Sequence, residues 1–103
     1  MIDLLDISYV RLGTRDLPGA ERFARDVLGL ELARREAGRS YLRSDSRDHT
    51  LVYFEGDPAD HTVGFELGSA AELEAAAAQL SNHGIPVHAG STEECEQRHV
   101  RAF

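Results

Sequence analysis

The chain has 103 residues, enough for one domain that buries roughly two-thirds of the surface of its unfolded chain. Its net charge is −7 and all eleven Lys/Arg positions are arginine, which argues against a nucleic-acid partner because phosphate attraction dominates such binding. No apolar run approaches the roughly 20 residues that span a bilayer, and the single cysteine, Cys95, cannot form an internal disulfide. These features predict a cytoplasmic domain without nucleic-acid or membrane partners.

The first half begins with a strand and a helix. Residues 7–12, ISYVRL, mix β-branched and aromatic residues with alternation around Arg11, which is typical of a strand. Asp16 then stands where a helix N-cap belongs, and Gly29 is placed to end the helix that we predict over residues 17–28. Six side chains at three- and four-residue spacing form its predicted apolar stripe: Leu17, Ala20, Phe23, Ala24, Val27 and Leu28.

Three strand-like segments follow this helix. They lie at residues 30–36, 40–45 and 50–56, and the first two are separated by a hairpin-like break at Gly38. Residues 55–60, EGDPAD, contain Gly, Asp and Pro in succession, which predicts a loop between two halves of the chain.

The second half repeats the order of the first. Residues 61–67 predict a strand, and Ser69 with Glu72 predicts a capping box at the start of a helix that Gly84 ends. The buried stripe of this helix is predicted to comprise Leu73, Ala76, Ala77 and Leu80. After it come a predicted strand at 85–89, a polar stretch at 91–97 that is either a loop or a short helical turn, and a predicted strand at 98–103.

Each half therefore reads as a βαβββ module, and the second lacks its last strand. The predicted fold class is α+β, with the paired modules forming a curled mixed sheet in a single domain, residues 1–103. Module one occupies about residues 6–56 and module two about residues 61–103. Since uncovered sheet edges attract partners, we expect a piece of a longer protein that pairs with a second domain, or a homodimer.

Two stretches carry a family resemblance. The segment YVRLGTRDLPGAERFARDVLGLEL (9–32) and the segment DHTVGFELGSAAELEAAAAQL (60–80) with HGIPV (83–87) resemble the openings of the two modules of the vicinal oxygen chelate superfamily. This superfamily includes glyoxalases, bleomycin-resistance proteins and extradiol ring-cleavage dioxygenases. The likeness covers nearly the whole chain and is nearest to the amino-terminal domain of two-domain extradiol dioxygenases.

The resemblance also implies where a metal site would lie. In the family, Fe(II) or Mn(II) is held at the base of a cup, commonly by His, His and Glu from the first strand of each module and the last strand of the second. The first position here holds Tyr9, the second His61, and the third would lie beyond Phe103. An uncharged phenol with a pKa near 10 is a poor ligand. His61 is therefore the single candidate metal ligand; no bound cofactor is expected in this chain, and no catalytic residue is assigned.

Three functions stay open at this stage. The first is the metal-free amino-terminal domain, or a fragment, of a ring-cleavage dioxygenase that acts on catechol-type aromatics. The second is a bleomycin-resistance-type protein that binds a small aromatic ligand, and an acidic cup would suit a cationic one. The third is a stand-alone metal-dependent glyoxalase-like enzyme. Five aromatic residues could line such a cup or pack in the core: Tyr9, Tyr41, Tyr53, Phe54 and Phe65. The other four histidines are predicted to have loop or surface roles: His49, His83, His88 and His99.

Overall fold

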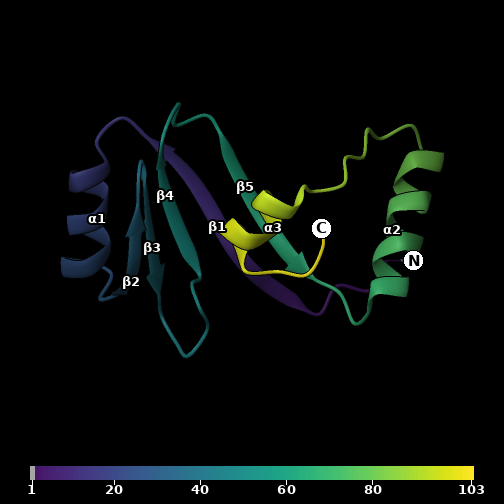
Figure 1. Ribbon diagram of the computed structural model, residues 1–103, viewed down its shortest axis with the longest axis horizontal. Helices are drawn as coiled ribbons and strands as arrows, with labels where there is room; N and C mark the ends of the chain where they lie inside the picture. Colours follow the sequence, from purple (N-terminus) through teal and green to yellow (C-terminus); the bar gives the residue numbers. More distant parts are fainter. Residues whose placement is uncertain (1) are drawn as a thin grey trace. The chain divides into compact units, whose positions relative to one another are not determined.

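The computed structural model describes residues 2–103 (Figure 1). Its elements in chain order are β1 (Asp6–Thr14), α1 (Leu17–Asp26), β2 (Glu31–Glu36), β3 (Arg39–Arg43), β4 (Leu51–Glu55), β5 (His61–Glu66), α2 (Ala70–Asn82) and α3 (Thr92–Arg98). Contacts divide the chain into two compact units. The sheet unit comprises Ile7–Gly64, and the helical unit comprises the residues up to Asp6 together with Phe65–Phe103. None of the helices in residues 2–103 is long and apolar enough to cross a membrane.

The sheet has five strands in the order β2-β3-β4-β1-β5. Strands β2, β3 and β4 are antiparallel neighbours, whereas β1 pairs in parallel with β4, with Val10 beside Leu51. Helix α1 packs against β3 and β4 on one face of this sheet (Figure 1). The α+β class and the mixed sheet that the sequence predicts are confirmed, and the five predicted strands up to residue 67 are all present.

Helix α1 begins at Leu17 as predicted but ends at Asp26, two residues before the predicted end, and its buried side only partly matches the predicted stripe. The Asp16 carboxylate accepts a hydrogen bond from the Gly19 amide at 3.0 Å, which caps the first turn. The predicted apolar stripe is only partly buried. Ala24 is completely buried, and Leu17 and Ala20 are half-buried. Phe23 is 49% and Val27 67% exposed, whereas Glu21 is only 8% exposed. A buried carboxylate is tolerable only when its oxygens find donors. The side that packs on the sheet is thus partly polar.

Glu21 finds those donors on β2 and β3. The Arg35 guanidinium donates to both carboxylate oxygens, at 2.6 and 3.1 Å, and the Ser40 hydroxyl donates at 3.3 Å. The hydrogen bonds from Arg35 hold the pKa of Glu21 below its ordinary value. Since Glu21 belongs to α1, Ser40 marks the face of the sheet that the helix covers, which we call the helix face.

Strand alternation then assigns the other side chains to the two faces. With the observed pairing, the helix face also carries Val10, Leu12, Leu42, Leu51 and Tyr53. The opposite face, here the far face, carries Tyr9, Arg11, Arg34, Glu36, Tyr41, Val52 and Phe54. Tyr41, Leu42 and Val52 are completely buried, so both faces contribute to the core of the sheet unit.

The helical unit departs from the predicted order of strands. Ser69 caps α2 by accepting from the Glu72 amide at 3.2 Å, but the Glu72 carboxylate accepts from Gly68 rather than from Ser69, so only half of the predicted capping box forms. The polar stretch left open between loop and turn is helix α3, and there Ser91 and Glu94 form a complete capping box.

The predictions of a strand at 85–89 and of another at 98–103 are wrong, since neither segment forms a strand. Residues 85–89 have no regular structure, and His99 adopts a left-handed conformation (φ 55°) that ends α3. The Phe103 ring lies under the Arg98 guanidinium at 4.5 Å, and its carbonyl accepts from the Gly90 amide at 2.9 Å. Alternation of apolar and polar residues favours a strand, but local capping and these closing contacts favour a compact turn. The assignment of residues 61–103 to a second module stays a prediction.

Candidate functional site

Tyr9, at the first ligand position implied by the resemblance, is buried on the far face. Its ring lies directly over Gly64 of β5. A methyl group built on Gly64 would stand 2.5 Å from Tyr9 Cζ. The Gly13 amide donates to the Asp60 carbonyl and the Leu5 amide to the Glu66 carbonyl, both at 2.9 Å, so β5 runs antiparallel to β1, and the Cβ position of Gly64 points to the face that holds the Tyr9 ring. Tyr9 is 6% exposed and acts as a core side chain of the sheet unit.

His61, the candidate metal ligand, points away from that position. The Cβ position of Gly64 meets the Tyr9 ring, so Gly64 lies on the face of Tyr9, and alternation along β5 places Thr62 on that face as well. His61 is three residues before Gly64, and alternation places it on the helix face. It is exposed, and its Nδ1 lies 3.0 Å from the Ala59 carbonyl oxygen. Thr62 and Gly64, rather than His61, therefore share the face of Tyr9.

The residues at these positions do not fit the metal that the resemblance implies. Three-ligand sites for Fe(II) need imidazole and carboxylate groups on one side of the ion. Tyr9 and His61 lie on opposite faces of the sheet. Among residues 2–103, no group of three or more His, Cys, Asp or Glu side chains is placed to hold a metal ion. No catalytic step through a metal therefore follows from these side chains.

The polar residues that the sheet unit does bring together surround His49. His49 lies in the loop between β3 and β4, in agreement with the predicted loop or surface role, but its side chain is only 1% exposed. Its Nδ1 lies 2.7 Å from an Asp48 carboxylate oxygen. Its ring packs edge-on against Tyr41, with centroids 5.1 Å apart, and lies 6.1 Å from the ring of Tyr9. A histidine of the connection between β3 and β4 is thus enclosed by two tyrosines of the far face.

The tautomer of His49 follows from Asp48. A carboxylate accepts hydrogen bonds and cannot donate them, so Nδ1 carries the proton and Nε2 presents a lone pair. This Nε2 atom is buried and has no hydrogen-bond partner in the described chain. Burial lowers the pKa of His49, the nearby Arg34 and Arg11 guanidinium groups lower it further, and Asp48 opposes them. His49 is therefore neutral at pH 7.

Around His49, arginines and carboxylates form a continuous network on the far face. Arg34 is ion-paired with Asp48, and its guanidinium stacks 4.0 Å above the Tyr41 ring. The Tyr41 hydroxyl donates to Glu36 at 3.1 Å, and Arg39 donates to the same carboxylate at 2.9 Å. The hydrogen bond from Arg39 contributes most to holding the pKa of Glu36 below its ordinary value. Such a network fixes the positions of β2 and β3.

We expect the unfolding free energy to fall as the pH is lowered from 7.5 to about 5. A histidine whose pKa is lower in the folded state binds protons more readily when the chain is unfolded. Its contribution to the free energy of unfolding is therefore fully present above the ordinary histidine pKa and is lost as the pH falls toward the pKa of the folded state. Substituting His49→Gln should flatten the dependence. Urea unfolding followed by tyrosine fluorescence measures it, because all three tyrosines lie in the sheet unit.

The matched control for this experiment is His88→Gln, because His88 is exposed. In that variant the free energy of unfolding should change with pH as steeply as in the unmodified chain. Working above pH 5 keeps the depressed carboxylates of Glu21 and Glu36 ionised throughout. If the free energy of unfolding fell equally steeply with pH in the His49→Gln and His88→Gln variants, burial of His49 would not be the cause of the lower stability in acid.

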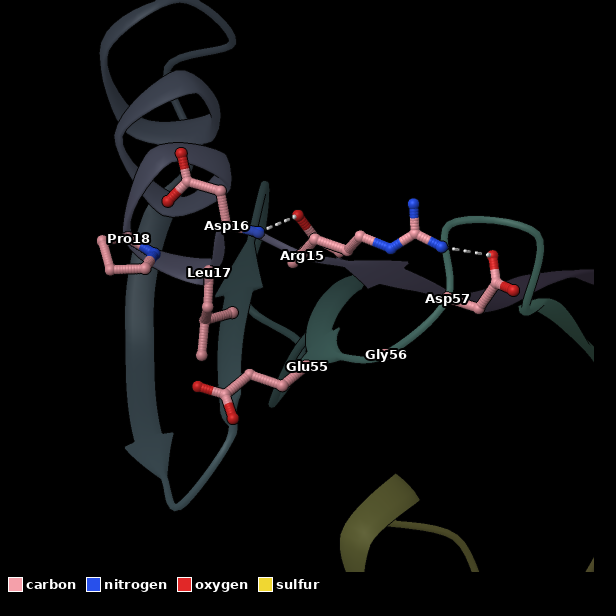
Figure 2. Close-up of a pocket in the computed structure, with 8 residues that line it drawn as sticks. Arg15, Asp16, Leu17, Pro18, Glu55, Gly56 and Asp57 are labelled. Atoms are coloured by element: carbon pink, nitrogen blue, oxygen red, sulfur yellow. Dashed lines mark hydrogen bonds and ion pairs between the residues drawn. The ribbon is translucent and has the colours of Figure 1, made fainter.

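A pocket of about 430 Å³ lies elsewhere in the sheet unit, where the parallel strands β1 and β4 end and α1 begins. Figure 2 shows Arg15 extended toward Asp57, 3.9 Å from its carboxylate, and Glu55 turned toward Leu17. Arg15 and Asp57 are mostly exposed, so their ion pair contributes little. The pocket presents charged groups but no buried polar atom directed at a ligand.

The predicted aromatic cup is only partly assembled on one face. Tyr9, Tyr41 and Phe54 share the far face, and the Arg11 guanidinium lies 5.8 Å from the Phe54 ring centroid. Tyr53 lies on the helix face. The sequence reasoning missed the part that Asp48 and His49 play. The adjacent Asp-His pair just before the most strand-like run was the signal that could have found it.

Comparison with known proteins agrees with this architecture. Residues 6–103 match the Glyoxalase/Bleomycin resistance protein/Dioxygenase superfamily. A curated relative, the iron-dependent extradiol dioxygenase of Rhodococcus jostii (strain RHA1), is 29% identical over 101 residues, which cover 96% of this chain and 34% of the relative. The chain thus spans about one-third of that relative's length.

Two solved structures show the same relation. A catechol 2,3-dioxygenase has a TM-score of 0.85 at 26% identity, over 97% of this chain and 35% of the enzyme. A variant of homoprotocatechuate 2,3-dioxygenase from Brevibacterium fuscum has a TM-score of 0.69 at 26% identity, over 85% of this chain and 25% of the enzyme. The family match covers nearly all of the chain, and the sheet-and-helix order agrees with it. The chain belongs to the Glyoxalase/Bleomycin resistance protein/Dioxygenase superfamily.

Proposed function

We propose that this chain is a metal-free module of an extradiol-type ring-cleavage dioxygenase and that its role there is structural. The proteins it resembles are named as an iron-dependent extradiol dioxygenase, a catechol 2,3-dioxygenase and a homoprotocatechuate 2,3-dioxygenase, and the chain matches about one-third or less of each. In this proposal iron is held by another part of the enzyme. The module supplies a rigid sheet whose far face is filled by the network around His49. We also propose that the enzyme works in the cytoplasm.

One observation carries the proposal. Tyr9 fills the first ligand position with a buried ring held over Gly64, and His61 faces the other side of the sheet. To bring both to one ion, β5 would have to shift by one residue, which would move every side chain of that strand to the other face. On the same face the Asp48 carboxylate is already engaged by the Arg34 guanidinium and by Nδ1 of His49, so it is not an open ligand position.

A binding role for a cationic aromatic ligand is less well supported. The far face carries three arginines, Arg11, Arg34 and Arg39, against the two carboxylates Glu36 and Asp48. Most of the net negative charge lies in the helical unit, whose eight Asp and Glu residues and two arginines give −6 of the total −7. The net charge of −7 therefore does not create an acidic aromatic surface on the sheet.

Anaerobic equilibrium dialysis against Fe(II) or Mn(II) tests this function. We expect binding far below one equivalent per chain, and no absorbance from a ring-opened product when a panel of catechols is added in air. The matched control is His61→Gln, which should give the same background. Binding of one equivalent that is lost in His61→Gln, or in Tyr9→Phe, would contradict the proposal.

A further inference from the structure

The connection between β3 and β4, residues 44–50, is held on the sheet unit mainly by one side chain. Its sequence, SDSRDHT, contains no apolar residue. Residues 44–47 are exposed, whereas His49 is buried and packs against the rings of Tyr9 and Tyr41. We call residues 44–50 the His49 loop. Because the other side chains of this loop bury little apolar surface, its packing depends on the His49 ring.

Two further hydrogen bonds hold the His49 loop closed, and both are exposed to water. The Ser44 amide donates to the Thr50 hydroxyl at 3.2 Å, and the Arg47 guanidinium donates to the Ile7 carbonyl at 3.0 Å. Exposed hydrogen bonds of this kind contribute little net free energy, because water replaces them when they break. Segments with few buried contacts open locally at a small part of the free energy of global unfolding. The His49 loop meets this condition.

The surroundings of His49 oppose a second proton on its ring. The charged and titratable groups packed around the ring are Asp48 in the loop itself, Arg34 on β2, Arg11 and Tyr9 on β1, and Tyr41 on β3. Asp48 favours the charged imidazole, but its carboxylate is shared with the Arg34 guanidinium. A proton on Nε2 would be buried and would find no acceptor among residues 2–103. A buried charge without a partner is costly.

This arrangement couples the position of the His49 loop to pH. In the closed loop, burial and the neighbouring Arg34 and Arg11 guanidinium groups lower the pKa of His49, so its ring is neutral at pH 7. In an open loop the ring would lie in water and would have the ordinary pKa of histidine. The open loop therefore binds a proton more readily than the closed loop, and lowering the pH favours opening.

We propose that the His49 loop is a pH-sensitive switch: protonation of Nε2 moves the ring away from Tyr9 and Tyr41, and residues 44–50 open while the five strands of the sheet stay paired. The proton comes from the solvent and Nδ1 keeps its own proton, so the released side chain is an imidazolium. Opening withdraws His49 from the two tyrosine rings, and the accessible surface of the far face then changes with pH. All these residues belong to the sheet unit, and the switch does not depend on the proposed role of the chain in a dioxygenase.

Amide hydrogen exchange of the full chain, followed by NMR from pH 7.5 to about 5, tests the proposal. The protection factor of the Ser44 amide, which already corrects for the intrinsic pH dependence of exchange, should fall by up to about tenfold for each pH unit below the ordinary histidine pKa. The Glu55 amide donates to the Gly38 carbonyl at 2.8 Å within the sheet and should stay far better protected at every pH. Equal protection of the two amides would mean that the loop opens only when the sheet unfolds, which would overturn the proposal.

Variants identify the group that takes up the proton. His49→Gln has no titratable ring at this position, and the protection factor of its Ser44 amide should not change with pH. Asp48→Asn removes the carboxylate that holds Nδ1–H, so the loop should begin to open at a higher pH. The matched control is His88→Gln, because His88 is exposed, and it should open like the unmodified chain.

The imidazole nitrogens provide a second measurement on the unmodified chain. Their NMR chemical shifts distinguish a neutral ring from a protonated one, and the protonated form of His49 should appear only together with open-loop signals from residues 44–50. A protonated His49 ring in a closed loop would overturn the proposal. So would a His49→Gln variant whose Ser44 amide loses protection with falling pH as steeply as that of the unmodified chain.

Discussion

Substituting Tyr41→Ala is expected to lower the free energy of unfolding of the sheet unit by about 4 kcal/mol, the cost typical of removing a large buried aromatic side chain. Tyr41 is completely buried on the far face. Its ring is in contact with His49 on one side and with the Arg34 guanidinium on another. Deleting the ring would leave a cavity and would remove the surface against which both groups pack. Urea unfolding followed by the fluorescence of the two other tyrosines measures the loss.

The contributions of the Tyr41 ring and of its hydroxyl to the free energy of unfolding can be measured separately. Tyr41→Phe removes only the hydrogen bond to Glu36, which should cost about 1 kcal/mol. Tyr53→Ala is the matched control, because Tyr53 lies on β4 and is only half-buried. It should cost clearly less than Tyr41→Ala. Equal losses in the two alanine variants would show that the far face is not the better-packed side of the sheet.

The order of elements from β1 to α2 could be predicted from the sequence because it depends on local signals. Asp16 before Pro18 marks the start of α1, and Gly29, which adopts a left-handed φ of 72°, marks its end. Alternating residues of high strand propensity likewise located every strand from β1 to β5. Such signals act over a few residues and need no knowledge of tertiary structure.

The side of α1 that is buried could not be predicted in the same way. Hydrophobic spacing selects Phe23 and Val27, but Glu21 takes the buried position because Arg35, fourteen residues further along the chain, reaches both of its oxygens. A tertiary ion pair of this kind leaves no trace in helical periodicity. The strand predicted at 98–103 failed for a related reason, since the contact of Phe103 with Arg98 competes with an extended conformation.

The candidate site shows the same limit. The family resemblance located Tyr9 and His61, but the faces of the two strands depend on register, and a shift of one residue reverses them. Only the pairing of β1 with β5 shows that Thr62, not His61, shares the face of Tyr9. The burial of His49 likewise depends on Tyr9 and Tyr41, which lie on separate strands. Contacts between distant residues, rather than motifs, decide what this face can do.

The close approach of Tyr9 to Gly64 leads to the second large expected effect. Gly64→Ala should lower the free energy of unfolding by about 2 kcal/mol, the typical cost of overpacking a core position. The added methyl group would stand 2.5 to 2.7 Å from three atoms of the Tyr9 ring. That ring is 6% exposed and is in contact with His49, so it has little room to move away.

A double-mutant cycle identifies the ring as the cause. In a Tyr9→Val background the space above Gly64 is free, and Gly64→Ala should then raise the free energy of unfolding by about 0.5 kcal/mol, because alanine loses less backbone entropy on folding than glycine does. The effect of one substitution thus changes sign with the residue at position 9, which is a direct measure of coupling between contacting residues. Urea unfolding of the four chains gives all the values required. If Gly64→Ala cost the same in both backgrounds, the close packing of the Tyr9 ring on β5 would not hold, and the assignment of Tyr9 and Gly64 to one face would fail with it.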